Sequence, residues 1–250
     1  MSELAWAASA DAAALVVVGE IDDEREPSDR MIDGDAGHHL QRVRRLGVGE
    51  QLVVADGAGR WYLARVSTVG DGSLNAQRLG PTWTEPRLYP LLTIAFTPAK
   101  SDRGTEVVHQ LVEVGVDRIV PLITERAVVR WDGANGARAA HRLARVAREA
   151  AEQCHRARVP DVDPPTKLDA LHGRTDVLLA DRSGDAVEEI ALPAGGVWLV
   201  AVGPEGGFTP QEREKLGAAT CVGVGPHTLR SVTAPVAVAA ALATRRSPGM

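Results

Sequence analysis

The chain has little cysteine, few aromatic side chains and no apolar run long enough to cross a bilayer. Cys154 and Cys221 are the only cysteines in 250 residues, too few for a disulfide framework and without the paired spacing of a zinc site. The longest apolar stretch, Ala234 to Ala243, falls well short of the ~20 residues that span a membrane. The first residues lack the basic leader of a secretory signal. We therefore expect a soluble, cytoplasmic protein with two reduced cysteines.

The chain also has no excess of positive charge. Its formal net charge is −5, and its 44% hydrophobic and 24% charged residues are ordinary for a globular protein of one large or two modest domains. Such a total does not by itself indicate nucleic-acid binding. Contacts to phosphate need only a local basic face, so that class of function stays open.

Residues 1–80 contain short apolar strands separated by glycine turns, a pattern that favours a small β-barrel. One helix is expected within this region: Asp35 can cap it, Leu40, Val43 and Leu46 lie on one face, and Gly47 ends it. The expected strands are Leu15–Val18, Gln51–Ala55, Arg60–Val66 and Ser73–Leu79.

Residues 81–90 hold three prolines and read as an extended linker between two domains. From residue 91 to 250 apolar strands alternate with helices, which predicts an α/β domain with a parallel sheet. The strands are expected at Leu91–Thr97, Arg118–Leu122, Val177–Ala180, Val197–Val202 and Ala219–Val224, and the helices at Ser101–Val114, Ala137–Gln153 and Thr233–Arg245.

Two glycine-bearing segments each follow a strand and precede a helix: VGPEGGFTPQE at 202–212 and VGPHTLRSVTA at 224–234. In the first, Thr209 and Glu212 form a capping box with Pro210 at the first helical position. Glycines let a backbone approach a ligand closely at the carboxyl edge of a parallel sheet, although a tight strand-to-helix turn is the commoner reason for them. Neither segment has a dinucleotide-binding or phosphate-loop pattern. Arg230, in the second, could bind phosphate, steady an anion or be a surface charge.

Further basic residues cluster at the helix of 38–45, at 100–103 and at 156–158. Each cluster could contact phosphate or could simply be a solvated face. Cys154 and His155 are neighbours on a helix and point about 100° apart, so they do not favour a catalytic dyad.

Taken in order, five strings resemble one family: GHHLQRVRRLGVGEQLVVADG, LVEVGVDRIVPLITERAVV, AREAAEQCHRARVPDV, VGPEGGFTPQE and VGPHTLRSVTA. The chain resembles the RsmE family of small-subunit (16S) ribosomal RNA uridine-N3 methyltransferases, in the SPOUT class of knotted methyltransferases. The resemblance runs from about Gly37 to the last helix.

The resemblance implies a PUA-like β-barrel over 1–80 that binds RNA, and a SPOUT methyltransferase domain over 91–250 whose C-terminal part forms a trefoil knot. It also implies a homodimer that uses S-adenosylmethionine. Arg230 would be catalytic, stabilising the uridine anion. The residues expected to bind the cofactor are Ala180, Asp181, Val202, Gly203, Pro204, Glu205, Gly206, Gly207, Val224, Gly225, Pro226, Thr228, Leu229 and Arg230. Those expected to contact RNA are His38, Arg42, Arg44, Arg45, Lys100, Arg103, Arg126, Arg156 and Arg158.

The sequence departs from the family pattern at three positions. Val232 stands where the closing motif usually has an acidic residue, His227 where arginine is common, and Cys154 where serine is usual. The loss of a carboxylate at 232 keeps two alternatives open. One is another SPOUT activity, such as ribose 2′-O-methylation of transfer RNA, and the other is a catalytically silent RNA-binding assembly factor.

Overall fold

The computed structural model describes residues 11–23, 28–99, 103–129, 131, 133–174, 176–217 and 219–249. The chain divides into two compact units, one of residues 1–86 with 151–159 and the other of residues 87–150 with 160–250. The segment 151–159 thus groups with the first unit, although the sequence division put it in the second. Hydrogen bonds explain this: Val159 N–H donates to the Gly57 carbonyl at 2.8 Å, and Arg158 N–H donates to the Glu85 carboxylate at 3.0 Å.

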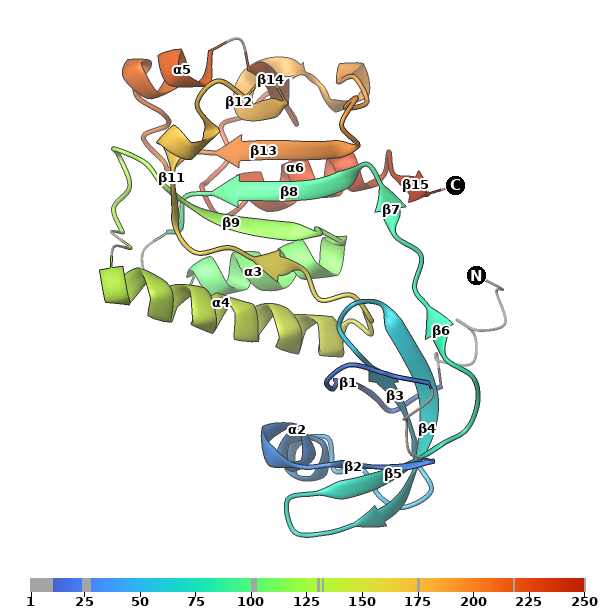
Figure 1. The fold of residues 1–250 in the computed structure, drawn as a ribbon. Helices are drawn as coiled ribbons and strands as arrows, with labels where there is room; N and C mark the ends of the chain where they lie inside the picture. The colour runs from blue at the N-terminus through green and yellow to red at the C-terminus, as the bar shows by residue number, and fades with distance from the viewer. Residues whose placement is uncertain are drawn as a thin grey trace. The chain divides into compact units, whose positions relative to one another are not determined.

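The first unit is built on a six-stranded sheet in the order β1-β3-β4-β5-β2, with β6 added beside β4 (Figure 1). β1 and β3 are parallel, and the other pairs are antiparallel. Apolar side chains on both faces are buried, in clusters around Leu52 and Tyr62 on one side and Val53 and Trp61 on the other. The strands are β1 (Ala14–Val17), β2 (Asp29–Ile32), β3 (Gln51–Ala55), β4 (Arg60–Val69), β5 (Leu74–Arg78) and β6 (Trp83–Thr84).

The helical segment of this unit differs from the prediction. A short α2 (Gly34–His38) runs into a π-helical turn, His39–Val43, and the N-cap residue is Asp33, which makes no side-chain cap bond. The expectation of an Asp35 cap was therefore wrong. Leu40 and Leu46 are buried as expected, but Val43 is 64% exposed, because the wider π turn rotates it off the face that a regular helix would bury.

The second unit contains a seven-stranded sheet in which all pairs are parallel, in the order β10-β9-β8-β13-β12-β14 with β11 beside β9. β8 and β13 are buried on both faces along nearly their whole length, as the unbroken apolar runs predicted. The strands are β8 (Leu91–Phe96), β9 (Arg118–Ile123), β10 (Asp161–Val162), β11 (Thr166–Lys167), β12 (Val177–Ala186), β13 (Val197–Val202) and β14 (Thr220–Gly223).

Helices cover this sheet (Figure 1). α3 (Arg103–Val114) and α6 (Ala234–Ala243) pack against each other, and α6 also lies on β8. Phe208 and Leu216, at the two ends of α5 (Pro210–Leu216), join a buried cluster with residues of the strands and of a 3-10 turn at Leu168–Leu171. α4 (Gly133–Gln153) is the longest helix of the described chain.

The C-terminal end of the described chain is fastened to the start of the second unit. β15 (Ser247–Pro248) pairs with β7 (Leu88–Tyr89). The buried guanidinium of Arg246 forms an ion pair with Asp117 and donates to the carbonyl oxygens of Pro90 and Gly115 at 2.8 and 2.7 Å. This bonding places α6 firmly against the sheet and so fixes the segment that precedes it.

Within the described residues, no helix is long and apolar enough to span a bilayer. Cys154 and Cys221 are both free thiols, half-buried. Cys154 lies at the end of α4, where its Sγ faces the Ala151 carbonyl at 3.8 Å.

Candidate functional site

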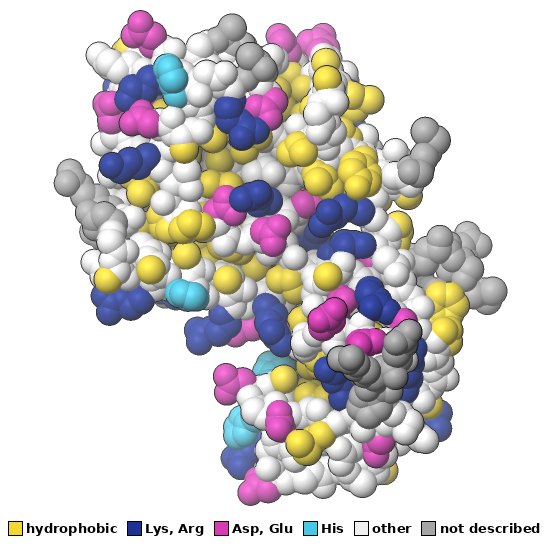
Figure 2. All heavy atoms as spheres, in the orientation of Figure 1, with side chains coloured by type: hydrophobic (Ala, Val, Ile, Leu, Met, Phe, Trp, Pro, Cys, Tyr) yellow, Lys and Arg dark blue, Asp and Glu magenta, His cyan; other side chains and the backbone are white. Residues whose placement is uncertain are grey.

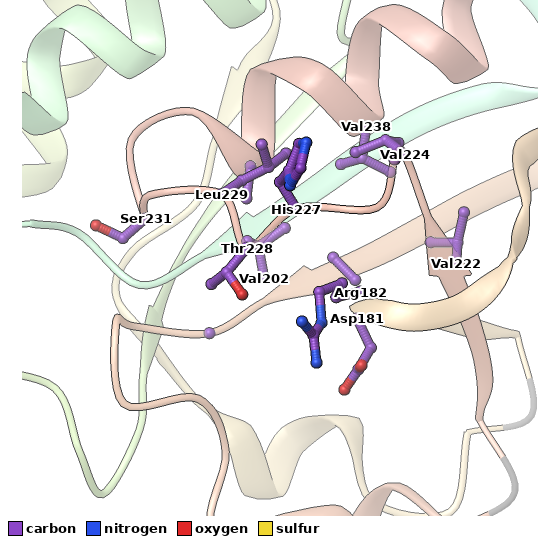
Figure 3. Close-up of a pocket in the computed structure, with 14 residues that line it drawn as sticks. Asp181, Arg182, Val202, Val222, Val224, His227, Thr228, Leu229, Ser231 and Val238 are labelled. Carbon is purple, nitrogen blue, oxygen red and sulfur yellow. The ribbon is translucent and has the colours of Figure 1, made fainter.

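A pocket of about 300 Å³ opens at the carboxyl ends of β13 and β14 and at residues 180–182 of β12, just past the part of β12 that pairs with β13 (Figure 3). This is the edge at which a parallel sheet is expected to bind its ligand. Its volume lies at the lower end of the range for small-molecule sites. The lining residues are Ala180, Asp181, Arg182, Val202, Gly203, Val222, Val224, Gly225, His227, Thr228, Leu229, Ser231, Ala234 and Val238.

The loop after β13 forms one wall of the pocket and leads into α5. The predicted capping box is confirmed: Glu212 N–H donates to Thr209 Oγ1 at 3.2 Å, and Thr209 N–H donates to Glu212 Oε2 at 2.9 Å. Gly207 has φ +65°, a conformation that favours glycine. The box fixes where the loop ends, so Gly203 is held at the pocket while Phe208 packs into the core.

Two further hydrogen bonds fasten this loop to the segment after β9. The other oxygen of the buried Glu212 carboxylate, Oε1, accepts from Glu125 N–H at 2.7 Å. Arg126 Nη1 donates to the Gly206 carbonyl at 2.5 Å. The glycine loop is thereby braced from two sides, and its backbone is preorganised at the pocket.

The segment after β14 forms the opposite wall, and it starts with Val224 and Gly225, the latter at φ +150°. It ends in a turn in which Thr233 N–H and Ala234 N–H donate to the Arg230 carbonyl, both at 2.9 Å, before α6 begins. Ser231 is 6% exposed and donates from Oγ to Glu205 Oε1 at 2.6 Å. This hydrogen bond joins the two walls.

The end of β12 supplies the third wall and an unusual strand contact. Val222 of β14 pairs first with Ala180 and, after a register shift, also with Asp185. A Cβ on Gly184 would lie 2.5 Å from backbone atoms of Cys221 and Val222, too close for any side chain. β12 therefore curves around β14, and glycine is required at 184 by the close backbone approach.

Asp181 is the one carboxylate in the lining of the described pocket, and its acceptor capacity is largely used. It forms an ion pair with Arg213 of α5, and its Oδ1 accepts from the Ser183 N–H and hydroxyl at 3.0 and 2.8 Å. The hydrogen bond from Arg213, with a smaller contribution from Ser183, lowers the pKa of Asp181 to about 2. The carboxylate is therefore charged at neutral pH and holds α5 to the pocket floor.

The pocket gathers residues from all three segments that the sequence singled out. Eight of the residues expected to bind a cofactor line it: Ala180, Asp181, Val202, Gly203, Val224, Gly225, Thr228 and Leu229. The others expected there, Pro204, Glu205, Gly206, Gly207, Pro226 and Arg230, belong to the same loops but do not line it. The sequence reasoning missed Arg182, Val222, His227, Ser231, Ala234 and Val238. Their position next to the motifs was the only signal available.

Arg230, the expected catalytic residue, is exposed and does not line the pocket. Its neighbours Leu229 and Ser231 both line the pocket. Arg230 is thus carried by a loop that borders the cavity.

The residues expected to contact RNA lie in both units, and each unit is considered by itself. In the first, His38, Arg42, Arg44 and Arg45 are exposed, whereas Arg156 and Arg158 are half-buried. Burial first, and then the positive charge of Arg44, lowers the pKa of His155, so Arg44 lies near the 155–158 segment. In the second, Arg103 and Arg126 are exposed, and Lys100 lies outside the described residues.

Arg158 has a structural role in the first unit. Its Nε and Nη2 donate to the Glu85 carbonyl at 3.0 and 2.8 Å, and its Nη1 donates to the Ala58 carbonyl. Gly59, which lies against this guanidinium, has φ +107°, a conformation that favours glycine. Arg158 therefore fastens the 155–159 segment to the sheet.

Basic and acidic side chains are interspersed on the visible face of each unit (Figure 2), in keeping with the net charge of −5. Contacts to a polyanion would depend on local groups such as those of the 38–45 segment rather than on the overall charge.

Comparison with known proteins agrees with this geometry. Residues 87–243 match the family described as an RNA methyltransferase domain, and residues 32–77 match the RNA methyltransferase PUA domain. The chain is 34% identical over 215 residues to ribosomal RNA small subunit methyltransferase E of Mycobacterium bovis, covering 82% of each chain. It is 30% identical over 222 residues to the Bacillus subtilis protein of the same name, covering 82% of this chain and 86% of that one.

A solved structure gives the same result. The crystal structure of ribosomal RNA small subunit methyltransferase E from Neisseria gonorrhoeae, bound to S-adenosyl methionine, is 28% identical with a TM-score of 0.81. The match covers 93% of this chain and 97% of that one. The family that the motifs predicted is confirmed: the chain belongs to the ribosomal RNA small subunit methyltransferase E family of RNA methyltransferases.

Proposed function

We propose that the protein transfers a methyl group from S-adenosylmethionine to N3 of a specific uridine in small-subunit (16S) ribosomal RNA. The observation that carries the proposal is the pocket bounded by the ends of β12, β13 and β14, with glycine backbone on two of its walls. The Neisseria gonorrhoeae relative, which shares this fold, is bound to S-adenosyl methionine.

The lining of the pocket suits the chemistry of S-adenosylmethionine. Its walls combine apolar side chains, such as Val202 and Val238, with glycine backbone at Gly203 and Gly225, a combination that can hold an aromatic base by packing and by main-chain hydrogen bonds. We assign cofactor binding to the fourteen residues that the sequence singled out in the three loops, with Glu205 and Arg230, whose side chains do not line the pocket, contributing through their backbone groups. We add Arg182, His227 and Ser231, which line the same cavity.

S-adenosylmethionine supplies a methyl group on a positively charged sulfur, and the protein must supply orientation and charge. Uridine N3 carries a proton at neutral pH and must lose it to become a nucleophile. A cation beside the base would stabilise the anion as it forms. Arg230 is our candidate because it is exposed and lies in the chain between Leu229 and Ser231, which line the pocket. Because N3 lies on the edge used in base pairing, the target uridine must be unpaired or flipped out.

RNA would be held by basic side chains of both units. In the first unit, His38, Arg42, Arg44 and Arg45 are exposed on and just after the helical segment. In the second, Arg103 and Arg126 are exposed, and Lys100 is part of the same proposal. For Arg156 and Arg158 the assignment rests on the resemblance, since both side chains are half-buried.

Three further features belong to the proposal. A trefoil knot is supported by the way β12 curves around β14 at Gly184 and Val222. A homodimer is supported by α6, which is apolar on all sides and leaves Val236 and Ala237 only half-buried. Action in the cytoplasm fits a ribosomal RNA substrate, and no described helix could span a membrane.

The test is methyl transfer to small ribosomal subunits, and to naked small-subunit RNA, prepared from cells that lack the protein. After reaction with labelled S-adenosylmethionine, the RNA is digested and its nucleosides are identified by mass and chromatography. 3-Methyluridine is the expected product. A 2′-O-methylated nucleoside, or no transfer to either substrate, would overturn the proposal.

A further inference from the structure

Glu205 and Ser231 meet where the two walls of the pocket join. Ser231 lines the pocket and is only 6% exposed, and its Oγ donates to Glu205 Oε1 at 2.6 Å. Glu205 itself is exposed, on the loop that carries Gly203. A solvent-exposed carboxylate is therefore held by a buried hydroxyl that lines the pocket, although Glu205 does not line the pocket itself.

The proposed reaction requires an acceptor for the N3 proton. Val232, where the family motif led us to expect an acid, is apolar and half-buried and cannot serve. The acceptor must then come from another segment that borders the pocket.

The pocket lining itself contains two titratable side chains that could accept a proton, Asp181 and His227. Asp181 is bound by Arg213 and Ser183 and lies at the opposite end of the lining from Ser231, with Thr228 and Val202 between them in the close-up (Figure 3). His227 also lies apart from Ser231 in that view. Glu205 is the carboxylate that is hydrogen-bonded to Ser231, at the other end of the pocket lining from Asp181.

On the basis of the proposed function, we propose that Glu205 is the general base that accepts the N3 proton of the target uridine. The proton passes from N3 to a carboxylate oxygen of Glu205, and the N3 electron pair forms the new bond to the methyl carbon. The carbon–sulfur bond breaks, and its electron pair stays on sulfur, which becomes a neutral thioether. Ser231 holds Oε1 of this carboxylate beside the pocket lining, and each carboxylate oxygen can accept more than one hydrogen bond.

The groups around Glu205 favour its ionised form, which is the form that can accept a proton. The hydrogen bond from Ser231 is the main cause that lowers the pKa of Glu205, and the positive charge of Arg103 on α3 lowers it further. The carboxylate is therefore ionised throughout the neutral range. Arg126 holds the adjacent Gly206 carbonyl, so the loop position of Glu205 is fixed by its neighbours.

The experiment compares Glu205→Gln with Glu214→Gln, a matched control at an exposed glutamate of α5. Single-turnover methylation of small subunits is measured across pH, and S-adenosylmethionine affinity is measured separately by calorimetry. Glu205→Gln should slow transfer by about 10²–10⁴-fold, the usual contribution of a general base, with an unchanged dissociation constant for S-adenosylmethionine. Glu214→Gln should match the wild type in both.

The pH profile distinguishes a base from a merely structural residue. Wild-type transfer should be level through the neutral range because Glu205 is already ionised. Glu205→Gln can react only with uridine that has ionised in solution, so its rate should rise about tenfold per pH unit. RNA made with 5-fluorouridine, whose N3 proton is more acidic, should partly restore the variant.

Three results would overturn the assignment. They are a wild-type rate in Glu205→Gln, a loss confined to cofactor affinity, or an equal loss with the same pH profile in His227→Gln. A wild-type protein that fails to methylate any uridine would instead refute the proposed function, so the two failures are separable.

Discussion

The buried carboxylate of Glu212 accepts a hydrogen bond from the backbone N–H of Glu125 at 2.7 Å, across 87 residues of sequence. The same carboxylate closes the capping box at Thr209. One side chain therefore fixes both the start of α5 and its distance from the end of β9, and the glycine loop that lines the pocket lies between these two attachments.

Glu212→Ala should destabilise the protein by about 2–3 kcal/mol, because it removes a helix cap and leaves buried N–H groups without acceptors. It should also weaken S-adenosylmethionine binding, since the loop loses its anchor. Denaturant unfolding and calorimetry measure the two effects. Glu214→Ala on the exposed side of the same helix is the control and should change stability by less than about 0.5 kcal/mol. Equal stabilities for the two variants would contradict the bracing role.

Gly184→Ala should destabilise the second unit by about 1–3 kcal/mol. The added Cβ would lie 2.5 Å from the backbone of Cys221 and Val222, where neither strand can give way easily. Thermal unfolding provides the measurement, with Gly195→Ala as the control because nothing lies within 4 Å of a Cβ there. A Gly184→Ala variant as stable as the control would mean that β12 and β14 do not approach as described.

The ion pair between Asp181 and Arg213 should make the stability of the protein depend on pH in the acidic range. The pKa of Asp181 is lowered to about 2 from 3.8. The ion pair therefore stabilises the fold at pH values above the pKa of Asp181 in the unfolded chain, and its contribution is lost as the pH falls through about 2. Because Arg213 is 46% exposed, solvent screening reduces the interaction to about 1 kcal/mol at neutral pH. A double-mutant cycle with Asp181→Asn and Arg213→Gln, repeated in neutral and strongly acidic buffer, should show the coupling disappear in acid. A coupling that does not change with pH would contradict this assignment.

Arg230→Ala should lower kcat by about 10²–10³-fold, the effect of removing one group that stabilises a developing anion. The dissociation constant for S-adenosylmethionine should stay within about twofold, because the side chain does not line the pocket. Steady-state kinetics with calorimetry separates the two. Full turnover by this variant would remove Arg230 from the mechanism.

Arg44 and Arg158 should behave differently although the sequence treated them alike. Arg44→Ala should leave stability within about 0.5 kcal/mol and lower the salt dependence of RNA binding by about 0.7–0.9 in the slope of log K against log salt. Arg158→Ala should destabilise the first unit by about 1–3 kcal/mol, since two backbone carbonyls lose their donors. Filter binding at several salt concentrations and denaturant unfolding make the comparison. The reverse pattern would reassign both residues.

Much of the fold could be predicted from local pattern. β3 and β13 have the bounds that their apolar runs indicated, and the capping box at Thr209 and Glu212 formed as written in the sequence. Two-residue strands such as Asp161–Val162 carry no periodicity and were not predicted. The π-helical turn that exposes Val43 was missed because its residues also suit a regular helix.

The sequence indicated which loops form the site, but not which of their side chains line the pocket. Glycine strings marked the segments that meet at the pocket, whereas Ser231 and Val238 became lining residues only when the strands were paired. The role of Arg158 depends on carbonyl oxygens 73 and 100 residues away in sequence. Partners so far apart in the chain cannot be predicted from the spacing of neighbouring residues.

The central claim is that the ends of β12, β13 and β14 form the S-adenosylmethionine site. Hydrogen–deuterium exchange with and without S-adenosylmethionine tests it most directly. We predict slowed exchange in the peptides that cover residues 180–186, 202–208 and 224–231, with the first unit unchanged. Protection confined to other segments, or none at saturating S-adenosylmethionine, would contradict the account.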